Sequence, residues 1–504
     1  MSLKCFSRVC SFIFFFISCF FIGYFIFADK TFGHASVDQI LFHARTPKTG
    51  ADKYLFCMAF VYAFLLPVFM FILLWAPSYL CPSKYKLHFH LKKYENQHFF
   101  QLVFSVFIFI LAGYSMDKSL NISEYLRNIK NPTTLYENYF VTPDKAGISF
   151  DKEKKNIVMI YLESMENTYG NGTVFKDNIL PNLTNFEKEG QSFKGFRQLN
   201  GTQWTIAGIF SSLCGAPIKT PIEGVRSEIY EIFMPGIVCI PELLQKNGYN
   251  NYFLLGSDAS FAGRQDFFNW HGFPNFWGMK EIKKEKGEIS KEMLGSAWGL
   301  NDHELFKIAK QKLTEISKNK ELFFFAILTV DTHFPNGYLN EKECQVKYNN
   351  FLDVVKCSDK EVGNFVNWIK KQSFADNTVI ILVGDHITMG NDVFNQIIKN
   401  PKREIVNIFI EPTGRRNIQE NREFSTMDLA PTILALTGAD IETNAFGLGR
   451  NLFSKEPTLL EVLGENFITE LERFSKYYQT FFPKDVQKYL DKKRKEGIFF
   501  LLFP

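Results

Sequence analysis

Three long apolar stretches without a single charge crowd the first quarter of this 504-residue chain, at residues 10–28, 54–75 and 99–116. A helix needs about 20 apolar residues to cross a bilayer, so each stretch is long enough to be a transmembrane helix. We interpret the first stretch as a retained helix rather than a cleaved signal peptide, because no small-x-small cleavage site follows it. The sequence therefore predicts a membrane anchor over residues 1–116 with about three transmembrane helices.

The charges that flank these stretches predict the orientation of the chain. The N-terminus carries Lys4 and Arg8, and the loop between the second and third stretches carries four lysines with Glu95 as its only acid. Such basic segments are typical of the cytoplasmic side. With three crossings, everything after Met116 lies outside. We expect a multi-pass protein of the bacterial cytoplasmic membrane, with its remaining residues on the periplasmic side.

The overall charge balance argues against one class of partner. The chain has 57 basic and 53 acidic residues, a net charge of +4, and 46% of its residues are hydrophobic. A nucleic-acid binder usually shows a marked basic excess, and a disordered chain lacks this apolar content. We therefore expect a folded protein that does not bind nucleic acid.

Four cysteines lie in the presumed exterior part, where an oxidising compartment permits disulfides: Cys214, Cys239, Cys344 and Cys357. Four cysteines allow three pairings, and the economical choice joins sequence neighbours, Cys214 with Cys239 and Cys344 with Cys357. Each short loop closed in this way would contribute roughly 3 kcal/mol. The alternative is four free, buried thiols.

Three regions follow the anchor. Residues 117–150 read as a polar juxtamembrane connector, with Asn131-Pro132 and Pro143-Asp144 as turn signals. Residues 151–455 alternate short apolar runs, typical of buried strands, with amphipathic stretches, typical of helices. The predicted strands are 157–162, 252–255, 322–329, 379–383 and 405–410, and the predicted helices are 241–247, 300–318 and 359–372. This alternation indicates an α/β domain with a mainly parallel sheet between helices.

The last region, residues 456–504, is predicted to be a helical extension. Residues 460–478 have a helix-like pattern, and a basic run at 491–496 precedes an apolar ending. Such a tail could sit at a membrane interface, although short tails of this kind are more often frayed or packed.

Polar residues with metal-binding chemistry follow two of the predicted strands. Glu163 comes directly after one strand, and Asp385 and His386 follow another. In open α/β sheets, functional residues gather beyond the carboxyl ends of strands, and carboxylates with imidazole suit a divalent cation. A simpler interpretation of Glu163 is a helix cap. Thr205 begins an apolar stretch, where a helix N-terminus would attract a phosphate or where an ordinary N-cap would stand.

Several segments together resemble one family. They are Glu163 after a strand, Trp204-Thr-Ile-Ala-Gly208, Phe261-Ala-Gly-Arg264, Trp298-Gly-Leu-Asn-Asp302, Thr329-Val-Asp-Thr-His333 and Asp385-His386. The set resembles the phosphoglycerol transferases of osmoregulated periplasmic glucans and, more distantly, the lipoteichoic acid synthases, all of the alkaline phosphatase and sulfatase-like superfamily. The resemblance covers about residues 150–455, and the family's cysteines match Cys214, Cys239 and Cys357.

The resemblance implies a set of site residues. Thr205 would be the nucleophile, and Glu163, Thr205, Asp385 and His386 would bind one divalent metal. That metal is manganese in the related synthases, with magnesium or zinc as alternatives. Arg264 and His333, and less clearly Asp258, would contact the phosphate or the glycerol hydroxyls. The segment Cys214-Gly-Ala-Pro217 departs from the Cys-x-Pro-x-Arg spacing of true sulfatases, so sulfate-ester hydrolysis is not expected.

The function implied is transfer of phosphoglycerol from phosphatidylglycerol to a periplasmic or surface glycan through a phosphothreonine-type intermediate. The nearest alternative is a phosphoethanolamine transferase acting on lipid A or a surface glycan. Such enzymes usually bind zinc with additional histidines, and the exterior part of this chain holds only His271, His303, His333 and His386. A hydrolase that releases the same group to water is a further alternative. From a different class, the chain could be a catalytically inactive glycan-binding membrane module.

Overall fold

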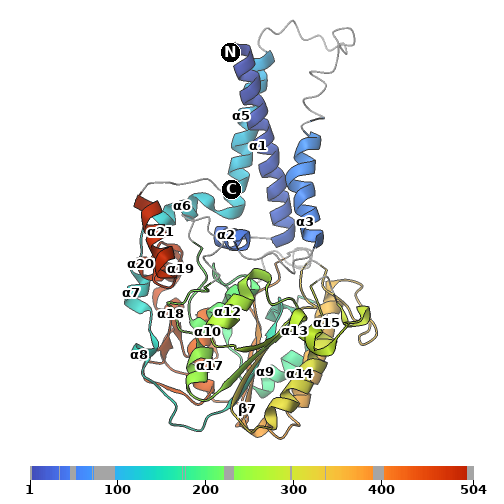
Figure 1. The fold of residues 1–504 in the computed structure, drawn as a ribbon, viewed down its shortest axis with the longest axis vertical. Helices are drawn as coiled ribbons and strands as arrows, with labels where there is room; N and C mark the ends of the chain where they lie inside the picture. Colours follow the sequence, from blue (N-terminus) through green and yellow to red (C-terminus); the bar gives the residue numbers. More distant parts are fainter. Residues whose placement is uncertain are drawn as a thin grey trace. The chain divides into compact units, whose positions relative to one another are not determined.

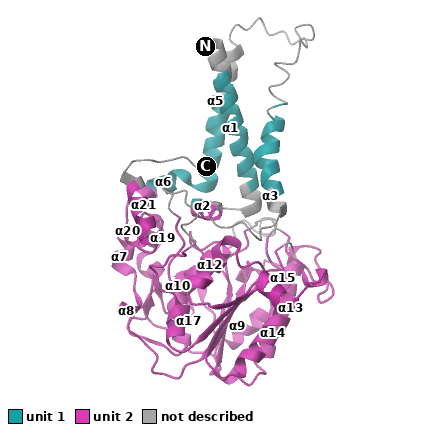
Figure 2. Ribbon diagram, viewed as in Figure 1, with its two compact units in different colours: residues 1–37, 52–127 teal, residues 38–51, 128–504 magenta. Residues whose placement is uncertain are grey.

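The computed structural model describes residues 3–32, 35–45, 53–70, 72, 97–172, 174–175, 177–220, 232–295, 298–334, 336–389 and 402–495. The chain divides into two compact units (Figure 2). The first contains Met1–Val37 and Asp52–Arg127, and the second contains Asp38–Ala51 and Asn128–Pro504. The short segment after residue 37 therefore belongs with the large C-terminal unit, although it lies between two apolar stretches in the sequence.

The first unit is helical. Its elements are α1 (Leu3–Phe32), α3 (Lys53–Phe60), the π-helical turn η1 (Val61–Leu65) and α5 (Gln97–Leu120). Two segments, Val9–Phe27 and Leu102–Leu120, are helices long and apolar enough to cross a membrane. Within the described residues the second predicted stretch is a shorter apolar helix, Cys57–Met70, and residues 73–75 lie outside them. The rings of Phe14 and Phe109 lie 5.3 Å apart, so α1 packs against α5.

A six-stranded sheet forms the centre of the second unit (Figure 1). Its order is β5 (Asn275–Trp277), β4 (Asn250–Leu255), β6 (Phe323–Leu328), β2 (Asn156–Leu162), β7 (Thr378–Gly384) and β8 (Asn407–Ile410). The first five strands are parallel, and only β8 runs antiparallel to its neighbour β7. The predicted α/β class with a mainly parallel sheet is confirmed.

Helices cover both faces of this sheet because successive strand residues point to opposite sides. Ile157, Met159 and Tyr161 of β2 join a core with α10 (Thr205–Cys214), α11 (Ile240–Lys246), α12 (Arg264–Trp270) and α17 (Leu429–Leu436). Val158, Ile160 and Leu162 join the opposite core with α9 (Pro181–Glu189), α14 (Asp302–Ser317) and α15 (Phe351–Ile369). Both faces of β2 are therefore buried, which explains its uninterrupted apolar sequence.

Some helix boundaries differ from the predicted ones. The helix predicted at 359–372 begins earlier, at Phe351, because the side chain of Asn350 accepts the backbone N–H of Leu352 and caps it. The helix-like stretch 460–478 is three short helices, α18 (Leu459–Leu463), α19 (Glu465–Glu472) and α20 (Lys476–Gln479). Gly464 breaks it with a φ of 55°, and Ser475 caps α20.

The remaining elements surround this framework. Residues 117–150 hold α6 (Ile122–Lys130), α7 (Leu135–Tyr139), α8 (Pro143–Ala146) and β1 (Ile148–Ser149). The other elements are α2 (Val37–Arg45), η2 (Asn167–Gly170), β3 (Lys194–Arg197), η4 (Phe261–Gly263), α13 (Met279–Lys286), η5 (Lys291–Met293), η6 (Ala375–Asn377), β9 (Asn421–Ser425), η7 (Thr426–Asp428), β10 (Asp440–Ile441), β11 (Ala445–Phe446), β12 (Gly449–Arg450) and α21 (Lys484–Lys495).

Candidate functional site

Glu163, Asp385 and His386 meet at the carboxyl ends of two neighbouring strands. Strands β2 and β7 are parallel, and Leu162 stands opposite Gly384, so the residues that follow are neighbours. One ligand atom from each of Glu163, Asp385 and His386 lies within 4.8 Å of the others, and all three side chains are buried. The sequence placed these residues at strand ends, and the structure brings them together.

Among the residues that the structure describes, two buried atoms of this cluster have no hydrogen-bond partner, Asp385 Oδ2 and His386 Nε2. They lie 3.5 Å apart, and Glu163 Oε1 lies 3.6 Å from the same nitrogen. The other imidazole nitrogen, Nδ1, lies 2.8 Å from the carbonyl of Ile387 and donates to it, so Nε2 is the nitrogen that faces the two carboxylates. Buried polar atoms rarely stay unpaired. Two carboxylates and an imidazole with open lone pairs fit a divalent cation.

The charges of the cluster lead to the same interpretation. Burial, followed by the charge of Glu163, raises the pKa of Asp385 to about 7. Burial opposes a charge on His386, but the neighbouring Asp385 and Glu163 outweigh it and raise its pKa. Two buried acids are costly unless a positive charge compensates them.

Thr205 is the first residue of α10, and this helix packs directly against the cluster of Glu163, Asp385 and His386. A Cβ atom placed on Gly208 would lie 2.0 Å from the carbonyl oxygen of Asp385, so only glycine permits this approach. Trp204 precedes the helix with an extended backbone, and Thr205 is only half-buried. The geometry therefore places Thr205 at the start of the helix turn that contacts Asp385.

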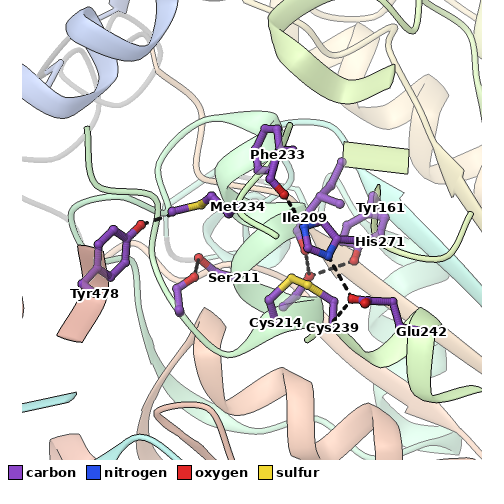
Figure 3. Close-up of a disulfide and its surroundings, with 12 residues drawn as sticks. Tyr161, Ile209, Ser211, Cys214, Phe233, Met234, Cys239, Glu242, His271 and Tyr478 are labelled. Carbon is purple, nitrogen blue, oxygen red and sulfur yellow. Dashed lines mark hydrogen bonds and ion pairs between the residues drawn. A yellow bond between two sulfur atoms is a disulfide. The ribbon is translucent and has the colours of Figure 1, made fainter. Parts of the chain in front are cut away.

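The far end of α10 is fixed by a disulfide (Figure 3). Cys214, the last residue of α10, pairs with Cys239, which stands before α11. The hydroxyls of Ser212 and Tyr161 lie 2.7 Å apart, which joins α10 to β2. The second pair, Cys344 with Cys357, is also formed, so the predicted neighbour pairing is confirmed.

Arg264 follows an unusual turn. Ala262 and Gly263 both have positive φ angles, 55° and 72°, before α12 begins. The guanidinium is buried and donates to the backbone carbonyls of Phe261 and Asp258. Burial lowers the pKa of Arg264 to about 10, while Glu163, Asp258 and Asp385 act in the opposite direction. The arginine stays charged and lies within electrostatic reach of Glu163 and Asp385.

Asp258 reaches this site through its backbone. Its carboxylate accepts hydrogen bonds from the amide and hydroxyl of Ser260, and Lys280 lies 3.4 Å away. Its carbonyl oxygen accepts from Arg264. The Asp258 side chain thus stabilises a local turn, and within the described part of the chain its hydrogen bonds and ion pair go to Ser260 and Lys280.

His333 stands beside Trp298, with ring centroids 4.2 Å apart. Its Nδ1 donates to the carbonyl of Phe334 at 2.8 Å, so its Nε2 is a hydrogen-bond acceptor. Burial lowers the pKa of His333 to about 4, and the charges of His386 and Arg264 contribute. His333 is therefore neutral near pH 7.

Sequence reasoning missed the residues that hold the cluster in place. Thr329 accepts the backbone N–H of Glu163, and Thr332 donates to its carbonyl. Ser164 has a positive φ of 54°, its amide donates to Asp385 and its hydroxyl donates to Glu163. Thr329 and Thr332 belong to the segment 329–333 that carries the family resemblance. Their hydrogen bonds to Glu163 on the neighbouring strand could not be predicted, because contacts across a sheet leave no local pattern in the sequence.

Comparison with known proteins adds the family. A family model described as Sulfatase matches residues 155–439, more than half of the chain, and this span contains every residue of the cluster. The chain belongs to the sulfatase family. In this sulfatase-family domain Cys214 is locked in a disulfide, in keeping with the absence of the Cys-x-Pro-x-Arg spacing.

Two curated relatives of this sulfatase-family chain carry the name phosphoglycerol transferase I. The protein from Escherichia coli is 30% identical over 414 residues, which is 79% of this chain and 52% of the relative. The protein from Escherichia fergusonii is 32% identical over 363 residues, 70% of this chain and 46% of the relative. The chain thus spans about half the length of these relatives.

One solved structure supports the fold assigned to this sulfatase-family chain. The lipoteichoic acid synthase LtaP from Listeria monocytogenes superposes with a TM-score of 0.51 at 16% identity. The match covers 72% of this chain and 97% of that structure.

Proposed function

We propose that this chain transfers phosphoglycerol from phosphatidylglycerol to a glycan on the outer side of the bacterial cytoplasmic membrane. The observation that carries the proposal is the contact between the first turn of α10, which bears Thr205, and the cluster of Glu163, Asp385 and His386. The name of the two relatives, phosphoglycerol transferase I, supplies the group transferred.

In the proposed reaction Thr205 Oγ attacks the phosphorus of the lipid. The bond from phosphorus to the diacylglycerol oxygen breaks, and diacylglycerol leaves with a proton, while phosphoglycerol stays on the threonine. A glycan hydroxyl then attacks the same phosphorus, and Thr205 leaves and regains its proton. A divalent metal held by Glu163, Thr205, Asp385 and His386 would lower the pKa of the hydroxyl and neutralise phosphate charge. We take manganese as this metal.

Arg264 and His333 bind the transferred group in this proposal. The positive charge of the buried Arg264 guanidinium stabilises the negative phosphoryl oxygens. Such stabilisation is stronger in a site that excludes water than at the surface. His333 has an unprotonated Nε2 at neutral pH and so accepts a hydrogen bond from a glycerol hydroxyl. This protonation state favours holding the glycerol over protonating the leaving oxygen.

The test is intact-mass spectrometry of the purified full-length protein after incubation with phosphatidylglycerol and Mn²⁺, without an acceptor. We expect a mass gain of one phosphoglycerol group that maps to Thr205 and is absent in Thr205→Ala. A phosphoethanolamine adduct formed from phosphatidylethanolamine instead would assign the alternative substrate. Diacylglycerol release without an adduct in the wild type would indicate hydrolysis. Metal binding with no turnover of either lipid would make the chain a binding module and overturn the proposal.

A second measurement tests the metal ligands separately from turnover. Mn²⁺ should raise the melting temperature of the wild type, because it binds the folded state. At a Mn²⁺ concentration of 100 times the Kd, the folded state gains about 2.7 kcal/mol. Asp385→Asn should abolish this rise. An equal rise in Asp385→Asn would remove that residue from the ligand set.

A further inference from the structure

Helix α2 packs against the residue next to the proposed nucleophile. Residues 38–51 belong to the same compact unit as the sulfatase-family domain. Phe42 is fully buried, with its ring 5.5 Å from Trp204 and 6.5 Å from Phe233. The carboxylate of Asp38 accepts the backbone N–H of Thr220 at 2.6 Å. These contacts fix α2 beside the start of α10.

His43, the residue after Phe42, extends an aromatic wall along the site. Its ring lies 6.2 Å from Trp204 and stacks 6.3 Å from Phe261. The ring of Phe261 lies 5.4 Å from Trp298, whose ring lies 4.2 Å from His333. The wall therefore joins two histidines that come from distant parts of the chain.

The charge of Arg264 acts on both of these histidines, His43 and His333. Its guanidinium lies 5.4 Å from the ring of Phe261. Burial, followed by the charge of Arg264, lowers the pKa of His43 to about 4. Two neutral imidazoles thus lie within electrostatic reach of the guanidinium that would hold the phosphate.

The ring nitrogens of His43 are free for a ligand. Its side chain is only half-buried, and no hydrogen bond to it occurs within the part of the chain that the structure describes. A neutral imidazole offers one donor and one acceptor, which matches a hydroxyl group. Glycerol attached to a phosphate carries two hydroxyls, and His333 has capacity for one of them.

We propose that His43 binds a hydroxyl of the transferred glycerol, and that α2 thereby makes the site selective for a glycerol headgroup. This inference rests on the proposed function and goes beyond it, because it adds a specificity residue from outside the span 155–439 that matches the family. A site built to bond a hydroxyl discriminates strongly against an analogue that lacks it.

The experiment compares two donor lipids in the full-length protein, phosphatidylglycerol and phosphatidylpropanol, which lacks both glycerol hydroxyls. Diacylglycerol release gives kcat/KM for each lipid. His43→Phe keeps an aromatic ring against Trp204 and Phe261 and removes the nitrogens. His43→Gln restores a donor and an acceptor. His303→Gln is the matched control, since that histidine pairs with Glu361 and Glu343.

We expect His43→Phe to lower the preference for phosphatidylglycerol over phosphatidylpropanol about tenfold, the value of one hydrogen bond. His43→Gln should recover most of the preference, and His303→Gln should keep all of it. A preference unchanged in His43→Phe would overturn the inference, and so would an equal loss of both activities, which indicates a purely structural role. If the wild type releases no diacylglycerol from phosphatidylglycerol, the proposed function fails first and the inference falls with it.

Discussion

Among individual residues, Asp302 and Asp331 form a buried pair of acids. Asp302 accepts the backbone N–H of Val330, and Asp331 accepts the backbone N–H of Asp302. The second oxygen of Asp331 has no partner among the residues described. Burial raises the pKa of Asp302 to about 7, and burial and the charge of Asp302 raise that of Asp331 well above its ordinary value.

This pair predicts a pH-dependent stability that Asp331→Asn removes. An acid with a raised pKa in the folded state favours folding below its unfolded pKa of about 3.9. That stability is lost as the pH rises through the folded pKa. We expect the wild-type melting temperature to fall from pH 5 to pH 8, and Asp331→Asn to show a smaller fall and to melt about 2 °C higher at pH 8. Thermal melts over this range decide it; a variant that melts well below the wild type at pH 8 would show that the ionised carboxylate stabilises the fold.

On the scale of secondary-structure elements, the close approach of α10 to Asp385 predicts the effect of a single methyl group. Alanine is more favourable than glycine inside a helix by about 1 kcal/mol. By this effect alone, Gly208→Ala would stabilise α10. Here its Cβ would collide with the Asp385 carbonyl, and we expect a loss of about 1–3 kcal/mol and at least tenfold slower diacylglycerol release. Gly172→Ala is the control, because a Cβ there meets nothing within 4 Å. Full activity in Gly208→Ala would contradict the contact.

Removing either disulfide should lower the stability by a similar amount, but only one of the two removals should also lower kcat. Replacing both cysteines of either pair by serine should cost roughly 3 kcal/mol, because the closed loops separate residues 25 and 13 positions apart. Only the pair Cys214–Cys239 ends α10, so only its removal should also lower kcat. Melting curves and kcat measured well below both melting temperatures separate the effects. An equal loss of kcat in the two double variants would show that the disulfide does not position α10.

For the whole molecule, the number of membrane crossings determines on which side the sulfatase-family domain lies. The described helix Cys57–Met70 is about 21 Å long, short of a hydrocarbon core of about 30 Å, whereas Val9–Phe27 and Leu102–Leu120 meet the length requirement. Three crossings place the domain opposite the N-terminus, and two place it on the same side. Disulfides are typical of the exterior.

We predict three crossings, because the apolar stretch 54–75 is long enough to span the bilayer. A C-terminal alkaline phosphatase fusion should then be active in cells and a C-terminal green fluorescent protein fusion dark, since each reporter works on one side of the membrane only. A fluorescent fusion with an inactive phosphatase would mean an even number of crossings and would overturn the proposed location.

The sequence by itself determined the parts of this protein that depend on local pattern. Apolar runs predicted the strands around Ile160 and Ile381, and the residues directly after them carried the chemistry of Glu163, Asp385 and His386. Parallel strands end at one edge of a sheet, so the sequence predicted that these side chains lie along that edge. The pairing of β2 with β7, which makes them neighbours, is a feature of the tertiary structure. The sequence favoured disulfides between neighbouring cysteines without excluding other pairings, and the structure has those two pairs.

Only the tertiary structure decided which distant segments complete the site. Helix α2 lies between two apolar stretches in the sequence but belongs to the C-terminal unit. The fully buried ring of Phe42 holds it there, because burying an aromatic side chain is strongly favourable. The turn at Ala262 carries Arg264 into reach of Glu163, and Gly208 lets α10 approach Asp385. Strand β8 runs antiparallel to β7. The direction of a strand depends on how it pairs with its neighbour and not on the β-propensity of its residues. These features arise from contacts between residues far apart in the chain, and no local pattern encodes such contacts.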